Sequence, residues 1–222
     1  MIEKNLKLVQ SMVNQAAVNC GRNPLEINLI GVSKKKSVEM ITEAFESGLT
    51  EVGENYVEEF LEKERRYHPK RLNYHFIGRL PTKKVRKIVG KSSIIHSVDS
   101  LKLAKKIDFV CSDEGICQEI FIQVHQGTEL TKSGVNPQEI EQLFSEIIDL
   151  NNIKIKGLMS IPPFNESARP YFVELRNIRD DLQDKFEVDL PYLSMGMSGD
   201  FQEAIEEGST HIRVGTAIFG SR

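Results

Sequence analysis

The feature of this 222-residue sequence that most constrains its fold is a repeated unit, a short apolar segment rich in β-branched residues followed by an amphipathic segment. Alternating or continuous apolar residues predict strands, and apolar residues spaced by three and four predict helices. Strands that alternate with helices favour parallel pairing through right-handed crossovers. The expected strands cover residues 27–33, 51–53, 74–77, 94–97, 119–125, 155–160, 192–195 and 212–214.

Helical segments separate these strands, and an additional helix precedes the first of them. Ser37 stands where an N-cap is expected, and Gly48 stands where the same helix should end. No helix is expected after the last strand, and the N-terminal helix could take that place. The expected helices cover residues 3–19, 37–47, 56–64, 82–89, 100–110, 137–150, 168–185 and 199–206.

Eight such units predict an α/β fold, a single (β/α)8 barrel of the TIM type with an extra N-terminal helix, in one domain that spans residues 1–222. The hydrophobic content of 40% is enough for one good core, and no low-complexity linker divides the chain. An open doubly wound sheet is the main alternative. No GxGxxG motif follows any expected strand, which argues against that alternative.

The charge balance narrows the range of partners. A formal net charge of −3 argues against a nucleic-acid-binding protein, and no apolar run approaches the length of a membrane span. The polar N-terminus is not a signal peptide, so we expect a cytoplasmic monomer without nucleic-acid or membrane partners. Cys20, Cys111 and Cys117 match no zinc or redox motif, and the five histidines form no HxxxH pattern, so we expect no metal site.

Chemistry in such a barrel is expected at the C-terminal ends of the strands. The loops after the seventh and eighth strands often hold phosphate, together with a helix N-terminus. Ser198 stands between the seventh strand and a short helix, and Gly215 and Thr216 follow the eighth strand. A glycine there lets the backbone approach an anion closely. An ordinary helix cap and an ordinary turn would give the same pattern.

The stretch INLIGVSKKKS ends the first strand in three lysines with different expected positions. Alternation places Ile30, Val32 and Lys34 on one face, and bulky branched residues favour the barrel interior. Lys34 therefore tops the interior column, whereas Lys35 points outward and Lys36 belongs to the loop before the helix cap. Low-dielectric walls would lower the pKa of an amine at Lys34 and favour Schiff-base chemistry.

Arg213 lies in the last strand on the same face as Gly215, so it is expected to point inward. A buried guanidinium requires a partner, and an internal carboxylate such as Glu54 would supply one in an ordinary structural role. Near Lys34, the positive charge of Arg213 would lower the pKa of the amine further. A reactive amine and a phosphate cradle suggest pyridoxal phosphate, and a cofactor-free lysine aldolase that acts on a phosphorylated sugar would use similar groups.

Six motifs follow one another along the sequence: GVSK, VGENYVEE, YHFIGRL, TKSG, IKGLMSIP and LSMGMSGDFQEAIEEGSTHIRVGTAIFGSR. In this order they resemble the motifs of the pyridoxal phosphate homeostasis protein family, a small, single-domain relative of the N-terminal barrel of alanine racemase. The similarity runs from about Val32 to Arg222, and the last motif is the most specific of the six.

The resemblance implies a cofactor site built around Lys34, which would hold pyridoxal 5′-phosphate as an aldimine. Ser198, Gly215 and Thr216 would hold the phosphate, and Arg213 would face the pyridine nitrogen. Further positions match family residues around the pocket or in the loop after the fifth strand. These are Asn55, His75, Gly78, Met159 and Met195 around the pocket, and Glu129, Lys132 and Gly134 in the loop.

The sequence departs from the family pattern at three places. After HFIG the family usually continues Leu-Gln-x-Asn-Lys, whereas residues 80–84 read LPTKK. His125 stands where asparagine is more usual, and Gly199 replaces a common aspartate after MGMS. Loss of that carboxylate at a helix start would favour an anion there.

The resemblance also implies a function. The protein would hold pyridoxal phosphate and exchange it with the free pool or with apo-enzymes that depend on this cofactor, with effects on amino-acid metabolism. An arginine at the ring nitrogen disfavours ring protonation, and alanine racemase adds a tyrosine base from a second domain and a partner subunit. This sequence stops at Arg222, directly after the barrel, so we expect a carrier and not an enzyme.

Two other hypotheses remain open. A weak amino-acid racemase or lyase would use Tyr56 or His75 as the second base. A face that binds RNA or protein is the third hypothesis, although a solvated helix face explains the same basic residues. These are Lys83, Lys84, Arg86, Lys87 and Lys91.

Overall fold

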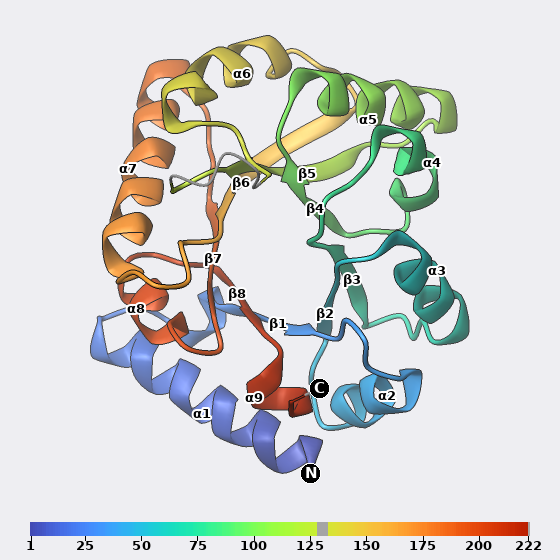
Figure 1. Cartoon of the computed structure of the whole chain (residues 1–222), viewed down its shortest axis with the longest axis vertical. Helices are drawn as coiled ribbons and strands as arrows, with labels where there is room; N and C mark the ends of the chain where they lie inside the picture. Colours follow the sequence, from blue (N-terminus) through green and yellow to red (C-terminus); the bar gives the residue numbers. More distant parts are fainter. Residues whose placement is uncertain (128–132, 222) are drawn as a thin grey trace.

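The computed structural model describes residues 1–127 and 133–221, which form a closed barrel of parallel strands (Figure 1). The strands follow one another around the barrel in chain order, and β8 pairs with β1 to close it. The expected barrel is confirmed and the open-sheet alternative is wrong, because an open sheet has two unpaired edges. The strands are β1 (Asn28–Val32), β2 (Glu51–Glu54), β3 (Asn73–Phe76), β4 (Ile94–Val98), β5 (Gln118–Val124), β6 (Ile153–Ser160), β7 (Tyr192–Met197) and β8 (His211–Val214).

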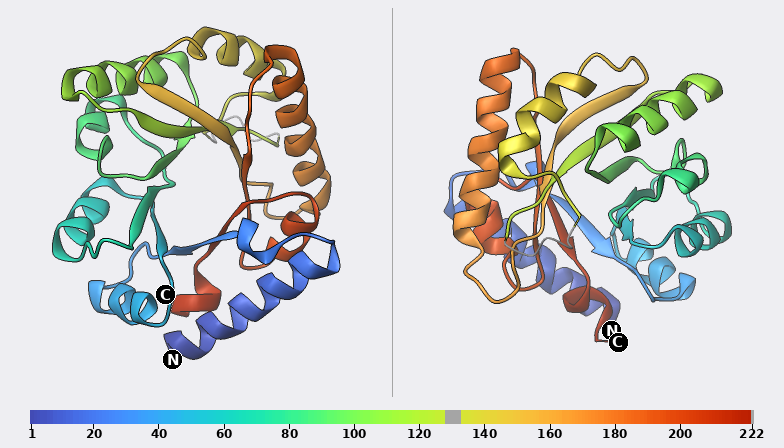
Figure 2. Two further views of the ribbon diagram at one scale, coloured as in Figure 1. Left: turned by 180° about the vertical axis from the view of Figure 1, so that it is seen from behind. Right: turned by 45° about the horizontal axis from the view of Figure 1, so that its top comes forward.

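Helices surround the strands as an outer layer (Figures 1 and 2). The helix expected at the N-terminus is present as α1. The helices are α1 (Ile2–Asn19), α2 (Val38–Glu46), α3 (Val57–Arg66), α4 (Val85–Ile88), α5 (Leu101–Glu114), α6 (Ile140–Ile147), α7 (Arg169–Phe186), α8 (Phe201–Glu206) and α9 (Thr216–Phe219).

The helical layer differs from expectation at three places. The segments expected as helix from residues 82 and 137 begin as 3₁₀ turns, at Thr82–Lys84 and Pro137–Glu139, and α4 and α6 start after them. A one-turn helix, α9, follows β8, where no helix was expected. The N-terminal helix still covers this side of the barrel, because α1 packs against both α8 and α9 (Figure 2).

The helix after the three lysines begins and ends where the sequence predicts. Ser37 is extended, and its hydroxyl accepts a hydrogen bond from the backbone N–H of Met40 at 3.4 Å, which satisfies one of the free donors of the first turn of α2. Gly48 follows the last turn at a φ of 105°, a conformation that favours glycine. The start of α2 therefore fixes where the loop after β1 ends.

Two layers of side chains fill the molecule. The larger layer lies between strands and helices, where the ring of Phe60 meets those of Tyr74 and Phe76 edge to face, with centroids 5.7 and 6.1 Å apart. A smaller apolar cluster of Ile94, Phe121 and Met159 is separate from this layer. The rings of His96 and His211 contact Phe121 of the smaller cluster, and Arg213 is also buried, so part of the interior is polar.

Small residues on the first two strands show which way each face of the sheet points. A Cβ added at Gly31 would overlap the side chain of Leu49 and lie 3.2 Å from Phe219 of α9, so this face meets the helical layer. A Cβ added at Gly53 would lie 2.9 Å from Cγ2 of Ile30, on the opposite face of the sheet. The expected alternation of β1, with Ile30 toward the interior, is confirmed.

Candidate functional site

A cavity of about 930 Å³ opens at the C-terminal ends of the strands. It lies between the ends of β1, β2 and β8, the loop after β7 and the segment that connects β6 to α7. Six of the ten residues predicted for the cofactor site line this cavity together. They are Lys34, Asn55, Ser198, Arg213, Gly215 and Thr216.

The three adjacent lysines have different surroundings. Lys34 lines the cavity. Lys35 has a φ of 61°, and its backbone N–H donates to the carboxylate of Glu59. The ammonium of Lys36 donates to the carbonyl oxygens of Phe219, Gly220 and Ser221 at 3.2, 3.0 and 3.0 Å. Only Lys34 among the three lines the cavity.

A buried cluster on the outer face of the sheet holds the backbone around Lys34. The ammonium of Lys63, on α3, donates to the carbonyl oxygen of Ser33 and to the carboxylates of Glu54 and Glu59, each at 2.6 Å. The hydroxyl of Ser33 also donates to Glu54, at 2.6 Å. Glu59 accepts a hydrogen bond from the backbone N–H of Lys35, and Lys63 donates one to the carbonyl oxygen of Ser33. The cluster therefore holds the backbone on both sides of Lys34.

Arg213 is fully buried in the barrel and donates to the hydroxyl of Ser194 at 2.6 Å and to the carbonyl oxygen of Ser160 at 2.8 Å. Glu54 is not its partner, because that carboxylate bonds to Lys63 on the outer face. Burial lowers the pKa of the Arg213 guanidinium to about 10, and the carboxylate of Asp200 opposes this shift. The guanidinium is therefore charged at neutral pH.

The three residues predicted to hold an anion, Ser198, Gly215 and Thr216, line the cavity together where the segments after β7 and β8 meet, and they are called the candidate anion cradle below. In the one-turn helix α9, the N–H groups of Ile218 and Phe219 donate to the carbonyl oxygen of Gly215 at 3.1 and 2.9 Å, whereas those of Thr216 and Ala217 lie at its N-terminal end. A Cβ added at Gly215 would lie 3.3 Å from the carbonyl oxygen of Val32, so a side chain would crowd the end of β1. The N–H groups of Thr216 and Ala217 are therefore the backbone donors that this end of α9 would offer to an anion.

The start of α8 differs from the expectation. Asp200, and not Ser198, occupies the N-cap position, and its carboxylate accepts from the backbone N–H of Met197 at 2.5 Å. Asp200 also lines the cavity. Sequence reasoning missed this carboxylate, although its place directly before Phe201 is a typical N-cap signal.

Asn55 presents an amide to the cavity. Its Oδ1 is buried and accepts no hydrogen bond from the described residues. A Cβ added at Gly78 would overlap the backbone of Asn55, so Gly78 lets the end of β3 pass directly beside it. Gly78 therefore positions Asn55 without lining the cavity itself. An orphaned acceptor of this kind fits a ligand with a hydrogen-bond donor.

The remaining predicted residues lie elsewhere. The ring of His75 bonds to His96 and Glu51 inside the barrel, and Met159 packs against Phe121. Met195 belongs to the layer between strands and helices. Gly134 packs against the backbone of His125, and Glu129 and Lys132 are outside the described residues.

One wall of the cavity was not anticipated. It is the segment from Ile161 to Ala168, between β6 and α7, in which Pro162 and Pro163 are followed by the almost fully exposed Phe164. The only signal in the sequence was its position at the C-terminal end of a strand, where its first two residues are the last two of the motif IKGLMSIP.

The basic face proposed as a docking surface is largely neutralised by ion pairs. Lys84 pairs with Glu58 at 2.7 Å, and Lys91 pairs with Glu64 at 3.7 Å. Arg86 contacts two carboxylates on α5, at 2.6 and 3.2 Å. These partners favour the solvated helix face over a nucleic-acid site.

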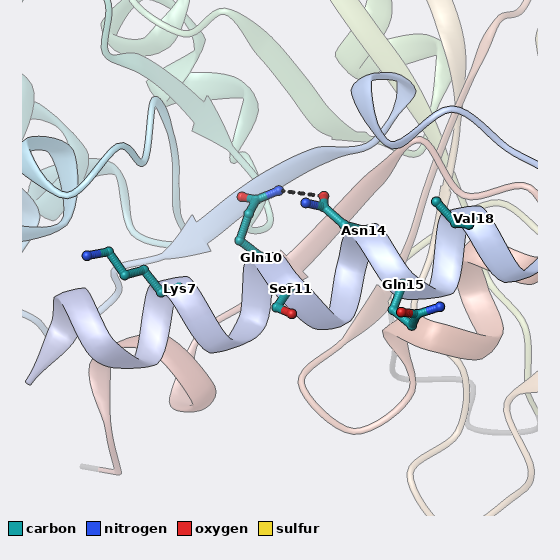
Figure 3. A pocket seen from close by; sticks show the side chains of 6 residues that line it. All are labelled: Lys7, Gln10, Ser11, Asn14, Gln15 and Val18. Carbon is teal, nitrogen blue, oxygen red and sulfur yellow. Dashed lines mark hydrogen bonds between the residues drawn. The ribbon is translucent and has the colours of Figure 1, made fainter.

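A second hollow lies along the outer side of α1, and every residue that lines it comes from that one helix (Figure 3). Its side chains interact with one another along the helix, as Gln10 does with Asn14 at 3.3 Å. No group from another element joins them in the lining, so the mouth cavity is the better candidate site.

Fold and site together define the class. The chain belongs to the family of the alanine racemase N-terminal domain, whose model matches residues 2–222. Within this class the similarity is more specific. The chain is 44% identical over 222 residues to the pyridoxal phosphate homeostasis protein of Aquifex aeolicus, a match that covers 99% of this chain and 97% of that protein. The protein of the same name from Vibrio cholerae is 38% identical, in a match that covers 100% of this chain and 96% of that protein.

Solved structures agree with this assignment. PipY of Synechococcus elongatus, solved without PLP, superposes with a TM-score of 0.89 at 32% identity and covers 99% of this chain and 100% of that one. The structure of PipY with PLP bound superposes with a TM-score of 0.88 at 33% sequence identity, and it also covers 99% of this chain and 100% of that one. Alanine racemase of Clostridium difficile gives 0.77 at 18%, and this chain covers 57% of it, so that likeness shows the fold alone. The resemblance read from the motifs is confirmed.

No helix in residues 1–127 and 133–221 is both long enough and apolar enough to cross a membrane.

Proposed function

We propose that this chain binds pyridoxal 5′-phosphate in the mouth cavity and acts in the homeostasis of that cofactor. One observation carries the proposal: a lysine, a buried arginine and the candidate anion cradle line the same cavity. The names of the relatives and the PLP-bound structure of PipY support the choice of cofactor.

The residues of the cavity suit the chemical groups of this cofactor. The aldehyde would supply an electrophilic carbon for the amine of Lys34. The cradle of Ser198, Gly215 and Thr216 would hold the phosphate through a hydroxyl and backbone N–H groups. Arg213 would donate to the ring nitrogen, and the orphaned Oδ1 of Asn55 would accept a hydrogen bond.

The same geometry supports a carrier. Because a donor-only guanidinium at the ring nitrogen disfavours ring protonation, the electron-withdrawing power that catalysis needs would be weak. The cavity opens at the mouth of the barrel, where a solvent amine or a partner could reach the cofactor. We propose a monomer of one domain, residues 1–222, located in the cytoplasm, whose acceptors are the free pool and apo-enzymes.

The racemase or lyase hypothesis gains no support from the candidate bases. His75 bonds to Glu51 and His96 inside the barrel, with its Nε2 2.7 Å from the carboxylate. Tyr56 is 50% exposed. Neither residue lines the described cavity.

The decisive experiment is reduction of the protein with borohydride in the presence of pyridoxal phosphate, followed by peptide mass spectrometry. We expect the label on Lys34, and we expect Lys34→Ala to lose both the label and the visible absorption band. Lys35→Ala is the matched control and should keep both. Label on Lys36 would contradict the assignment.

A measurement of catalytic turnover distinguishes a cofactor carrier from a racemase or lyase. The purified protein should racemise or deaminate no amino acid, yet should transfer its cofactor to an apo-enzyme. Sustained turnover that Lys34→Ala abolishes would replace the carrier with an enzyme.

A further inference from the structure

A line of polar side chains crosses the interior of the barrel, where packed branched residues are usual. It starts at Arg213 on β8, whose guanidinium donates to the hydroxyl of Ser194 at 2.6 Å. That hydroxyl lies 2.9 Å from Nδ1 of His96, and Nε2 of His96 lies 3.0 Å from Nδ1 of His75. The line ends where Nε2 of His75 meets the carboxylate of Glu51 at 2.7 Å.

Donor and acceptor rules, together with the cost of a second buried cation, favour one direction for this line of hydrogen bonds. A guanidinium only donates, so the hydroxyl of Ser194 accepts from it and turns its own proton toward Nδ1 of His96. His96 then carries its proton on Nε2 and donates it to Nδ1 of His75. His75 in turn carries its proton on Nε2, which faces an ionised carboxylate. All four hydrogen bonds are satisfied with both imidazoles neutral and protonated on Nε2. The opposite direction, in which the second lone pair of Ser194 accepts from Nδ1 of His96, would need a doubly protonated His75 or a protonated Glu51. A second cation in the interior that already holds Arg213 is costly, so the first arrangement is favoured.

The surroundings of this line of hydrogen bonds stabilise the neutral form of His96. Ser194 and His96 are fully buried, and His75 is nearly so. Burial lowers the pKa of His96 well below its ordinary value, and the neighbouring His75, His211 and Arg213 add to this shift. A chain of aligned hydrogen bonds in a low dielectric also polarises its members in the same direction.

We propose that His96 and His75 are positioning residues for Arg213, and that they connect its guanidinium through an oriented chain to the distant carboxylate of Glu51. The chain fixes the rotamer of Arg213, so that the donors not used by Ser194 and Ser160 face the mouth cavity. The consequence for the cofactor rests on the proposed function, because it requires that Arg213 meet the ring nitrogen. The chain itself does not depend on any ligand.

His211 supplies a matched control. It is as buried as His75, and its ring centroid lies 6.1 Å from that of His96. Its own hydrogen bonds go to Thr210 at 2.9 Å and Asn28 at 3.3 Å, outside the chain. Replacing His211 therefore disturbs the same interior without breaking the line to Arg213.

The first test reads the proton positions directly, in the full chain without cofactor. Two-bond 1H–15N correlation of histidine-labelled protein at pH 7 should show His96 and His75 as neutral rings with the proton on Nε2. A proton on Nδ1 of either ring, or a doubly protonated ring, would overturn the proposal, because the hydrogen bonds would then run in the opposite direction, toward Ser194.

The second test follows Arg213 in arginine-labelled protein. Its Nη signals should be resolved in the wild type and in His211→Phe, because hydrogen bonds slow rotation of the guanidinium. They should merge in His96→Phe and in Ser194→Ala. Ser194→Ala is a small change that breaks the same line if His96→Phe does not fold. Resolved signals in Ser194→Ala would refute the positioning role.

The third test adds pyridoxal phosphate labelled at its ring nitrogen. We expect His96→Phe to weaken retention about tenfold and to change the 15N shift of the ring nitrogen, whereas His211→Phe stays within about twofold of the wild type. Unchanged retention and shift in both His96→Phe and Ser194→Ala would refute positioning of the cofactor. Failure of the wild type to bind would refute the proposed function and leave the first two tests to decide the chain.

Discussion

At the scale of single residues, the hydrogen-bond partners of each lysine indicate its role. Lys36 is held by three backbone carbonyls, and Lys63 is held by a carbonyl and two carboxylates. Both amines serve the structure. Lys34 lines the cavity beside Arg213 and the candidate anion cradle. The place of each lysine in the fold, on α3, in the loop before α2 or at the cavity, sets these three roles apart.

The proposed phosphate site leads to a prediction about affinity. Ser198→Ala and Thr216→Val each remove one hydroxyl that would donate to the phosphate, and each should weaken cofactor retention by about 1.5–3 kcal/mol. Titration of the visible band against free pyridoxal phosphate measures this loss. Ser11→Ala, on the outer side of α1, is the control. Wild-type affinity in both variants would place the phosphate elsewhere.

The buried cluster around Lys63 leads to a second prediction. Lys63→Met leaves Glu54 buried without its cation, so we expect the free energy of unfolding to fall by about 3–5 kcal/mol, measured by urea denaturation. Labelling of Lys34 by borohydride should also fall, because the carbonyl of Ser33 loses its donor.

The double variant Lys63→Met, Glu54→Gln separates these two effects. It removes the uncompensated charge and should recover most of the stability, yet Ser33 still lacks its donor. Full recovery of Lys34 labelling together with stability would show that the cluster does not position the lysine.

Alternation along β1 was enough to single out Lys34, because strand geometry is local. The part played by Lys63 could not be read in the same way. Its amine reaches across from another element, and a lysine on an amphipathic helix is usually solvated. Asp200 was missed for a simpler reason, since Ser198 was given the cap two residues too early.

At the scale of elements, caps set the boundaries that position the site. Ser37→Ala removes the side-chain acceptor at the start of α2 and should cost about 1 kcal/mol in the free energy of unfolding. Urea denaturation measures it, with Ser11→Ala again as control, which should change by less than about 0.5 kcal/mol. Equal stability of the two variants would mean that the hydroxyl of Ser37 contributes nothing.

Most boundaries of the helices and strands could be predicted from the hydrophobic periodicity and from capping residues. The exceptions lie where tertiary contacts decide. Whether the first turn before α4 or α6 is 3₁₀ or α depends on how the loop meets its neighbours. The one-turn α9 is too short for any periodicity to reveal, and it is held between α1 and the end of β8.

At the scale of the whole molecule, the buried histidines make stability depend on pH. Burial lowers the pKa of His211 to about 3, and burial also lowers the pKa of His96 well below its ordinary value. In the unfolded chain each histidine titrates near pH 6.5. Below that pH the unfolded state binds protons that the folded state does not, so stability falls as pH falls. Each histidine contributes up to about 1.4 kcal/mol per pH unit.

Urea denaturation at successive pH values between 6.5 and 4 should therefore show a declining free energy of unfolding. His211→Gln removes one of these two rings, His211 and His96, and should reduce the slope that they cause by about half. An identical slope in wild type and variant would mean that His211 is protonated in the folded protein.

The number and order of strands could be predicted from the repeat, because each unit is encoded locally. The polar interior could not, because alternation shows which residues face inward and not which of them touch. His75, His96 and Glu51 come from three different strands, and only the closed sheet brings them together.

Closure of the barrel brings together the two parts of the chain that line the cavity. Lys34 follows the first strand and Arg213 belongs to the last, and these strands pair across the seam of the barrel. This pairing joins residues far apart in sequence, which is slow to form in folding. A chain with an open seam would lack half of the site, so a ligand that needs both halves binds only the closed state and stabilises it by mass action. Cofactor supply would then act on the lifetime of the protein that carries it.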